Sequence, residues 1–278
     1  PNSEVKHSEP LLLHWKGNNP FYSFPEIRNC ADNTPQISPG EDPNWDIYNL
    51  DLNQMGNWYG NPFKSEQRNA IDSVLRNEGS LQIVALPTGY GKTRIVQTVT
   101  RVLRHHEKGP TLMISPLVAL RDDQREDFEK EVNKPFDHFG DGGMESRFIT
   151  SSEQDHSSIR RELITDKLDL LCCAPEQILY PSTSSSWFEA FHRMEKPFST
   201  LVVDEAHLIG DWGSSIRPQF LLIEMLKDRL IEMNPKLRVV LQSATITKSE
   251  EKELRRMFGN LEVLETIRIP DVRDDLYF

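Results

Sequence analysis

The sequence predicts an α/β fold, in which a mostly parallel sheet is covered by helices on both faces and preceded by an irregular N-terminal arm. The expected strands are continuous apolar runs, as is typical of parallel strands buried on both faces. Segments with helical periodicity separate these runs, which is the pattern of an α/β protein. The length of 278 residues, with 37% of them hydrophobic, suffices for one large domain or two small ones.

The N-terminal arm is expected because the first 46 residues show no sustained hydrophobic period. They hold many of the 18 prolines, with Asn, Ser and Asp between them. Their aromatic residues argue against full disorder and are expected to anchor the arm on the main body. These anchors are Trp15, Phe21, Tyr22, Phe24 and Trp45.

Strands and helices alternate from about residue 61 onward. Strands are expected at 81–86, 111–115, 147–150, 168–174, 200–203, 237–242 and 261–264. The first helix is expected to have Ser65 as its N-cap and to stop at Gly79, and the second ends before Gly109. Further helices are expected at 117–132, 157–163, 220–231 and 249–257. The functional loops of such a fold lie at the carboxyl ends of its strands.

Composition excludes several classes of protein. The net charge of −11 excludes a polybasic binder that works through bulk charge alone. No window approaches the ~20 apolar residues that span a membrane, so no membrane partner is expected. Cys30, Cys172 and Cys173 form neither a disulfide framework nor a zinc pair. They indicate reduced thiols and a cytoplasmic protein, or a nuclear one in a eukaryote. Because the chain begins at Pro1, it is expected to be an excised or processed piece.

The strongest local motif runs from Leu86 to Thr93, between an expected strand and an expected helix. Glycines let backbone N–H groups approach phosphate oxygens, and the helix N-terminus favours anions. Lys92 is expected to reach the terminal phosphates and Thr93 to ligate Mg²⁺. Leu86 stands where the strict pattern has Gly, so the alternative is a Gly-rich turn before an ordinary helix. The cradle itself is formed by Pro87, Thr88, Gly89, Tyr90 and Gly91.

A second motif, Asp-Glu-Ala-His at 204–207, follows a Val-rich strand. At this edge of a parallel sheet, Asp204 is expected to hold Mg²⁺ and Glu205 to activate the attacking water. Taken alone, the motif is more often a surface turn, but its place downstream of Lys92 favours the catalytic interpretation.

These two motifs in this order resemble the first motor domain of a superfamily 2 helicase, a RecA-like P-loop NTPase domain. The further segment 204–218, DEAHLIGDWGSSIRP, resembles the aromatic-rich loop of the RecQ family, which couples DNA to ATP hydrolysis. The resemblance covers about residues 59–275 and implies ATP and Mg²⁺ as cofactors and DNA, rather than RNA, as partner. Ser214 and Ile216 depart from the RecQ loop, and Lys64 stands where the family has Arg.

The resemblance also implies roles for further residues. Residues 63–67 resemble the adenine-reading segment of this superfamily, in which Gln67 would bond the base edges. Its ATP-binding members are Phe63, Lys64 and Gln67. Contacts to the nucleic acid are expected from Ser115, Pro116, Arg121, Pro175, Trp212 and Arg217. Coupling of hydrolysis to domain movement is expected from His207, Gln242, Ser243 and Thr245. The alternatives are a packing role for Trp212 and ordinary solvated side chains at Lys64 and Arg121.

The sequence therefore predicts three parts, namely an arm (1–58), a RecA-like ATP-binding domain (59–265) and a linker (266–278) toward a second motor domain. That second domain, which supplies an arginine finger, is absent from the chain, so weak hydrolysis and no unwinding alone are expected. Either a truncation or a partner subunit explains the absence. Two other functions remain as alternatives to a DNA helicase. They are an RNA helicase of the same superfamily and a nucleic-acid-binding or scaffold module with a vestigial nucleotide site.

Overall fold

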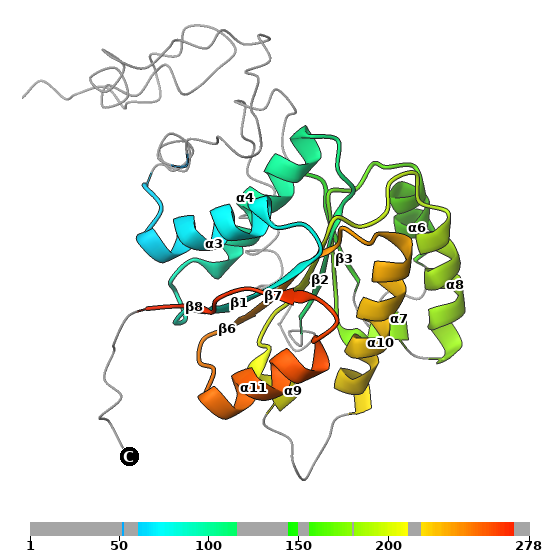
Figure 1. Cartoon of the computed structure of the whole chain (residues 1–278). Coiled ribbons are helices and arrows are strands. Elements are labelled where there is room, and N and C mark those ends of the chain that lie inside the picture. The colour runs from blue at the N-terminus through cyan, green and yellow to red at the C-terminus, as the bar shows by residue number, and fades with distance from the viewer. Residues whose placement is uncertain are drawn as a thin grey trace, which may run out of the picture. The chain divides into compact units, whose positions relative to one another are not determined.

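The structure, a computed structural model, describes residues 52, 61–115, 144–149, 156–179, 181–210 and 218–269 (Figure 1). The expected arm, apart from residue 52, and the expected helix at 117–132 lie outside these residues. The chain divides into two compact units, Pro1–Phe63 with Pro135–Gly143, and Lys64–Lys134 with Met144–Phe278. Every helix and strand described below belongs to the second unit.

A parallel sheet forms the centre of the second unit, which confirms the predicted fold class. Within the described residues it has eight strands in the order β3-β4-β2-β5-β6-β1-β7, with β8 also pairing with β1. Every one of these pairings is parallel. The strands are β1 (Ser80–Ala85), β2 (Thr111–Ile114), β3 (Ser146–Ile149), β4 (Leu170–Cys173), β5 (Thr200–Val203), β6 (Arg238–Ser243), β7 (Glu262–Val263) and β8 (Ile267–Arg268).

Helices cover both faces of this sheet, and Figure 1 shows α3 and α4 on one side of the central strands and α10 and α11 on the other. Leu81 and Ile83 of β1 pack in one hydrophobic core with residues of α6, α8, α10 and α11. The helices are α3 (Ser65–Arg76), α4 (Lys92–His105), α6 (Ser157–Ile164), α7 (Pro175–Leu179), α8 (Pro181–His192), α9 (His207–Gly210), α10 (Pro218–Met233) and α11 (Lys248–Met257). No helix in the described ranges is both long and apolar enough to cross a membrane.

Two details differ from the sequence-based expectation. Ser65 is the first residue of α3 rather than its N-cap, which is Lys64. The amide oxygen of Gln67, at position N3, accepts from the N–H of this N-cap residue at 2.9 Å, as in a capping box. Residues 267 and 268, expected in the linker, pair with β1 as strand β8.

The segment that ends in β8 is also held by side chains of α11. Glu251 accepts hydrogen bonds from Arg255 at 2.9 Å and Thr266 at 2.6 Å, and it pairs with Arg268. Burial opposes the ionisation of Glu251, but these partners outweigh it and lower the pKa of the carboxyl group. The C-terminal end of the described chain is therefore attached to both the sheet and α11.

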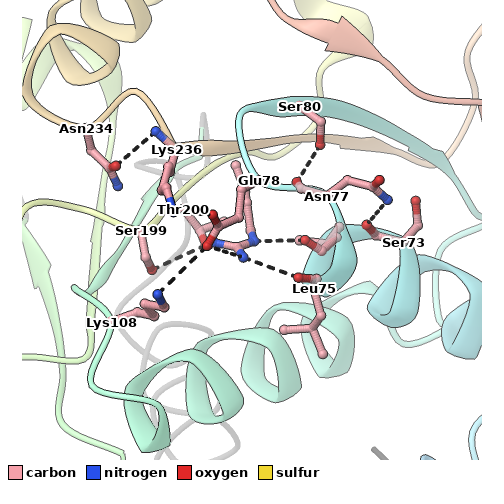
Figure 2. A network of polar contacts seen from close by, with 12 residues as sticks. Ser73, Leu75, Asn77, Glu78, Ser80, Lys108, Ser199, Thr200, Asn234 and Lys236 are labelled. Carbon is pink, nitrogen blue, oxygen red and sulfur yellow. Dashed lines mark hydrogen bonds and ion pairs between the residues drawn. The ribbon is translucent and has the colours of Figure 1, made fainter. Parts of the chain in front are cut away.

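A polar network joins α3 to the amino-terminal ends of the strands (Figure 2). Arg238, at the start of β6, is 2% exposed and donates to the carbonyls of Val74 at 2.9 Å and Leu75 at 3.2 Å. Its guanidinium also lies 3.3 Å from Glu78, which pairs with Lys236 at 2.9 Å. A buried cation thus satisfies carbonyls at the C-terminal end of α3, where such groups lack helical partners.

We expect Arg238→Met to lower the free energy of unfolding by about 2–4 kcal/mol, because two helix carbonyls and Glu78 lose a buried partner. Denaturant unfolding monitored by circular dichroism measures this. The control Lys236→Ala removes a 70% exposed partner of the same Glu78 and is expected to cost under about 1 kcal/mol. Equal costs for the two variants would contradict the assigned role of Arg238.

Candidate nucleotide-binding site

The loop between β1 and α4 has the backbone geometry of a phosphate-binding loop. The N–H of Leu86 donates to Ser243 O at 3.0 Å, so the loop starts from the paired edge of β1 and β6. Gly89 and Gly91 have φ values of 74° and 87°, in the left-handed region that favours glycine. Gly91 is the N-cap of α4, and a Cβ on it would lie 2.5 Å from Gln67 Nε2. The loop therefore needs glycine at this position for both reasons.

The N-terminal end of α4 adds favourable groups for an anion. Its first turn holds Lys92 and Thr93 and no acidic residue. Lys92 Nζ donates to the Leu86 carbonyl at 3.0 Å, which folds the ammonium group over the loop. Positive charge, a helix N-terminus and a hydroxyl thus meet at one place.

Gln67 links α3 to this loop. Its Nε2 donates to the carbonyls of Tyr90 at 3.0 Å and Gly91 at 3.2 Å. The side chain is buried, and its Oε1 is the acceptor of the Lys64 N–H described above. Its expected partner was a nucleotide base, whereas the structure places its amide against the loop. Phe63, expected beside it, is buried but belongs to the first unit of the chain.

Three side chains meet at the tip of the loop. The Tyr90 hydroxyl donates to the Glu66 carboxylate, and Lys64 Nζ lies 3.8 Å from the centre of the Tyr90 ring. The hydrogen bond to Glu66, with burial and the Glu66 charge, raises the pKa of Tyr90 to about 12. The same bond lowers the pKa of Glu66. Sequence reasoning missed Glu66, whose only signal is its place beside Gln67.

Asp204 lies at the carboxyl end of β5, two strands from β1 in the sheet. Its N–H donates to Ile114 O at 2.8 Å, and Ser115 Oγ lies 3.5 Å from its carboxylate. Burial, followed by the charge of Glu205, raises the pKa of Asp204 to about 6, and the charge of Lys92 acts in the opposite direction. Lys92 and Asp204 are therefore close enough for their charges to interact.

The backbone of Glu205 is strained. Its φ of 49° lies in the left-handed region, which is uncommon for a residue with a side chain. The turn is held on both sides, because the Ala206 N–H donates to Gln242 O at 3.0 Å and the Leu208 N–H donates to Glu205 O at 2.9 Å. The Glu205 carboxylate lies 3.3 Å from His207 Nδ1. The structure thus fixes a half-exposed carboxylate beside Asp204.

His207 joins this acidic pair to the end of β6. Its Nδ1 lies 2.8 Å from Ser243 Oγ, which donates to Thr245 O at 2.9 Å. Because the Ser243 hydroxyl donates to the carbonyl, its oxygen is placed to accept from Nδ1 of His207. The side chain of Gln242 is buried, and its Oε1 accepts no hydrogen bond from any described residue. His207, Ser243 and Thr245 therefore form one hydrogen-bonded chain.

Of the residues expected to contact nucleic acid, the structure describes Ser115 and Pro175. The Ser115 N–H donates to Cys173 O at 3.0 Å, which leaves this serine between β4 and Asp204. Pro175 is the buried first residue of α7. Pro116, Arg121, Trp212 and Arg217 lie outside the described residues.

The donor set fits a magnesium ion that is shared with a triphosphate. Within the described ranges no group of three or more His, Cys, Asp or Glu side chains is placed to hold a metal by itself. Mg²⁺ is usually bound by one or two carboxylates together with water and substrate phosphates. Asp204, as a buried carboxylate, and Thr93, as a hydroxyl at the N-terminus of α4, are the residues that would hold it.

In buffer that contains a chelator, we expect Asp204→Asn to stabilise the fold at pH 7.5 but not at pH 4. A carboxyl group whose folded pKa of about 6 exceeds its unfolded value adds stability below about pH 4, and this is lost as pH rises through about 6. The neutral amide avoids that loss, which amounts to about 1–3 kcal/mol. Denaturant unfolding at both pH values measures it. The control is Asp72→Asn, at a half-exposed position, and the same shift there would contradict the burial of Asp204 as the cause.

Comparisons with known proteins agree with this geometry. Residues 64–254 match the family model described as DEAD/DEAH box helicase. The "ATP-dependent DNA helicase RecQ" of Haemophilus influenzae is 29% identical over 167 residues, which cover 59% of this chain and 23% of the relative. The "ATP-dependent helicase SGS1" of Saccharomyces cerevisiae is 27% identical over 220 residues, covering 78% of this chain and 14% of the relative. The chain thus spans under a quarter of either relative.

Solved structures add evidence on the fold alone. A crystal structure of the DUF1998 helicase MrfA matches with a TM-score of 0.51 and 19% identity, over 73% of this chain and 30% of that one. The family match covers the phosphate loop, Asp204, Glu205 and the strand that ends at Ser243. With RecQ helicases among its relatives, the chain belongs to the DEAD/DEAH box helicase family.

Proposed function

We propose that this chain is the ATP-binding motor domain of a RecQ-like DNA helicase that couples ATP hydrolysis to movement on DNA and to strand separation. The observation that carries the proposal is the juxtaposition, at one edge of the sheet, of the phosphate loop with the acidic pair. Lys92 is near enough to Asp204 to affect its pKa. Relatives that are named as DNA helicases support DNA rather than RNA as the partner.

The residues divide the work as follows. The loop from Pro87 to Gly91 and the first turn of α4 bind the phosphates, and Lys92 neutralises the terminal ones. Mg²⁺, when bound, neutralises charge that develops on the phosphoryl group. Glu205 accepts the proton of the attacking water, and His207 holds its carboxylate. Ser243 and Thr245, which are connected to the acidic pair through His207, couple ATP hydrolysis to movement of the segment that leads to α11.

Further parts of the proposal depend on the whole protein. A second RecA-like domain, in the same polypeptide or a partner subunit, completes the site with an arginine and makes translocation possible. Without it, this chain binds nucleotide weakly, turns it over slowly and does not unwind a duplex. Trp212 and Arg217 contact DNA, together with Ser115, Pro116, Arg121 and Pro175. A cytoplasmic or nuclear location remains a prediction from the cysteine content.

Titration calorimetry of ATP into this chain, with Mg²⁺ and with a chelator, tests the nucleotide site. We expect Lys92→Ala to weaken binding by about 10- to 100-fold, because a charge-assisted contact is worth about 1.5–3 kcal/mol. The control Lys236→Ala removes the same charge at the opposite ends of the strands and is expected to leave binding unchanged. Equal affinity of wild type and Lys92→Ala would reject the phosphate cradle.

The nature of the nucleic acid needs a separate test. We expect single-stranded DNA to stimulate ATP turnover of the protein that carries this chain more than RNA of the same length and sequence. Stronger stimulation by RNA would favour an RNA helicase. No ATP turnover with either polymer would favour a binding module with a vestigial nucleotide site.

A further inference from the structure

The tip of the phosphate loop has a side chain that the proposed reaction does not use. Tyr90 projects to the first turn of α3, where its hydroxyl donates to Glu66 and its ring packs under Lys64 Nζ at 3.8 Å. Ser65 Oγ donates to the same carboxylate oxygen of Glu66 at 2.9 Å. A hydrogen bond to a charged group and a cation–π contact therefore hold one side chain of the loop.

The backbone of the same loop is held from the same side. Gln67 donates one N–H to the Tyr90 carbonyl and the other to the Gly91 carbonyl. The C=O and N–H of a trans peptide point in opposite directions. With these carbonyls on the α3 side, the N–H groups of Gly91 and Lys92 face away from α3, as a phosphate cradle requires.

We propose that Tyr90, Glu66 and Lys64 form a loop anchor, which holds the phosphate loop in the geometry that binds a triphosphate whatever base the triphosphate carries. This inference rests on the proposed nucleotide binding. Tyr90 is then a positioning residue, since it acts on the ligand through the backbone that it fixes. Gln67 acts with it, because its Nε2 donates to two carbonyls of the same loop.

The anchor contributes by ordering the loop before the ligand arrives. Two glycines with positive φ give this loop more conformational freedom than other residues would, and that freedom is lost on binding. Contacts that order the loop in advance reduce this cost and increase the affinity. Since the pKa of Tyr90 is raised to about 12 and that of Glu66 is lowered, the phenol remains the donor and the carboxylate the acceptor at neutral pH.

Binding of a ligand without a base provides the decisive experiment. Magnesium tripolyphosphate, ATP and GTP are titrated into wild type, Tyr90→Phe, Glu66→Gln and Lys92→Ala. We expect Tyr90→Phe and Glu66→Gln to weaken all three ligands by the same factor, about 3- to 10-fold for a partly exposed charged hydrogen bond. The control Asp72→Asn removes the same charge from the same helix without a contact to the loop.

The outcomes separate the anchor from the nucleotide site itself. A loss confined to ATP would mean that Tyr90 contacts the base, and unchanged affinities would mean that the anchor has no effect, so both overturn the inference. If Lys92→Ala also binds tripolyphosphate like wild type, the proposed function fails as well. Amide hydrogen exchange without ligand gives an independent readout. We expect the N–H groups of residues 89–92 to exchange several-fold faster in Tyr90→Phe, and an unchanged rate would equally reject the anchor.

Discussion

Replacing Glu205 by Gln is expected to lower the rate of ATP hydrolysis by about 10²–10⁴-fold, the usual contribution of a general base. Glutamine has nearly the same shape, so the left-handed turn at this position and the contact with His207 persist. It accepts no proton from water, however. Affinity for ATP is expected to remain within about three-fold of wild type, since the phosphate contacts are unchanged.

Steady-state turnover and equilibrium binding, measured on the protein that carries this chain, check this result. Glu253→Gln on α11 makes the same chemical change away from the site and is expected to leave turnover unchanged. If Glu205→Gln hydrolyses ATP at the wild-type rate, Glu205 is not the base. If it loses binding along with turnover, the residue supports the fold of the site rather than the chemical step.

The largest effect on stability is expected from Gly109→Ala, at a buried position between α4 and β2. A Cβ on Gly109 would lie 1.7 Å from the carbonyl oxygen of Pro197 and 2.7 Å from its carbonyl carbon. These are backbone atoms, and the Ser199 N–H bonds the Pro110 carbonyl at 2.9 Å, so the segments before β2 and β5 have little freedom to separate. We expect the free energy of unfolding to fall by about 3 kcal/mol or more.

Gly89→Ala is the matched control, because among the described residues, its two chain neighbours aside, no atom lies within 4 Å of the added Cβ. Only its φ of 74° is unfavourable. That strain costs about 1–2 kcal/mol. Denaturant unfolding of both variants measures the difference. A Gly109→Ala protein as stable as wild type would mean that the two segments lie further apart than the structure has them.

Much of the fold was predictable because buried parallel strands are recognisable as apolar runs. The strand expected at 200–203 matches β5, and that at 81–86 is displaced by one residue from β1. Helix α8 was missed, since its first residues are Pro, Ser and Thr and carry almost no hydrophobic period. It forms because Trp187 and Phe191, four residues apart, are buried on one face. Strand β8 was missed because two residues give no pattern.

The candidate site was predictable where it depends on local sequence and not where it depends on distant contacts. A Gly-rich loop before a helix and an acid pair after a strand are local motifs. Tyr90 and Glu66, by contrast, are 24 residues apart, and nothing in either segment indicates that they meet. The strained φ of Glu205 is likewise imposed by the neighbouring strand β6, through the bond from Ala206 to Gln242.

The position of β1 in the sheet has a consequence for how the protein is made. The neighbours of β1 are β6, β7 and β8, the last three strands of the described chain, so its ladder stays incomplete until residue 268 has been synthesised. At a translation rate of ~5–20 residues per second, β1 waits roughly 10–40 s after it leaves the ribosome. During that time β2 to β5 can pair with one another, while an apolar strand and the loop after it remain unprotected. The strand that leads into the phosphate loop is therefore the last of the described strands to complete its pairing.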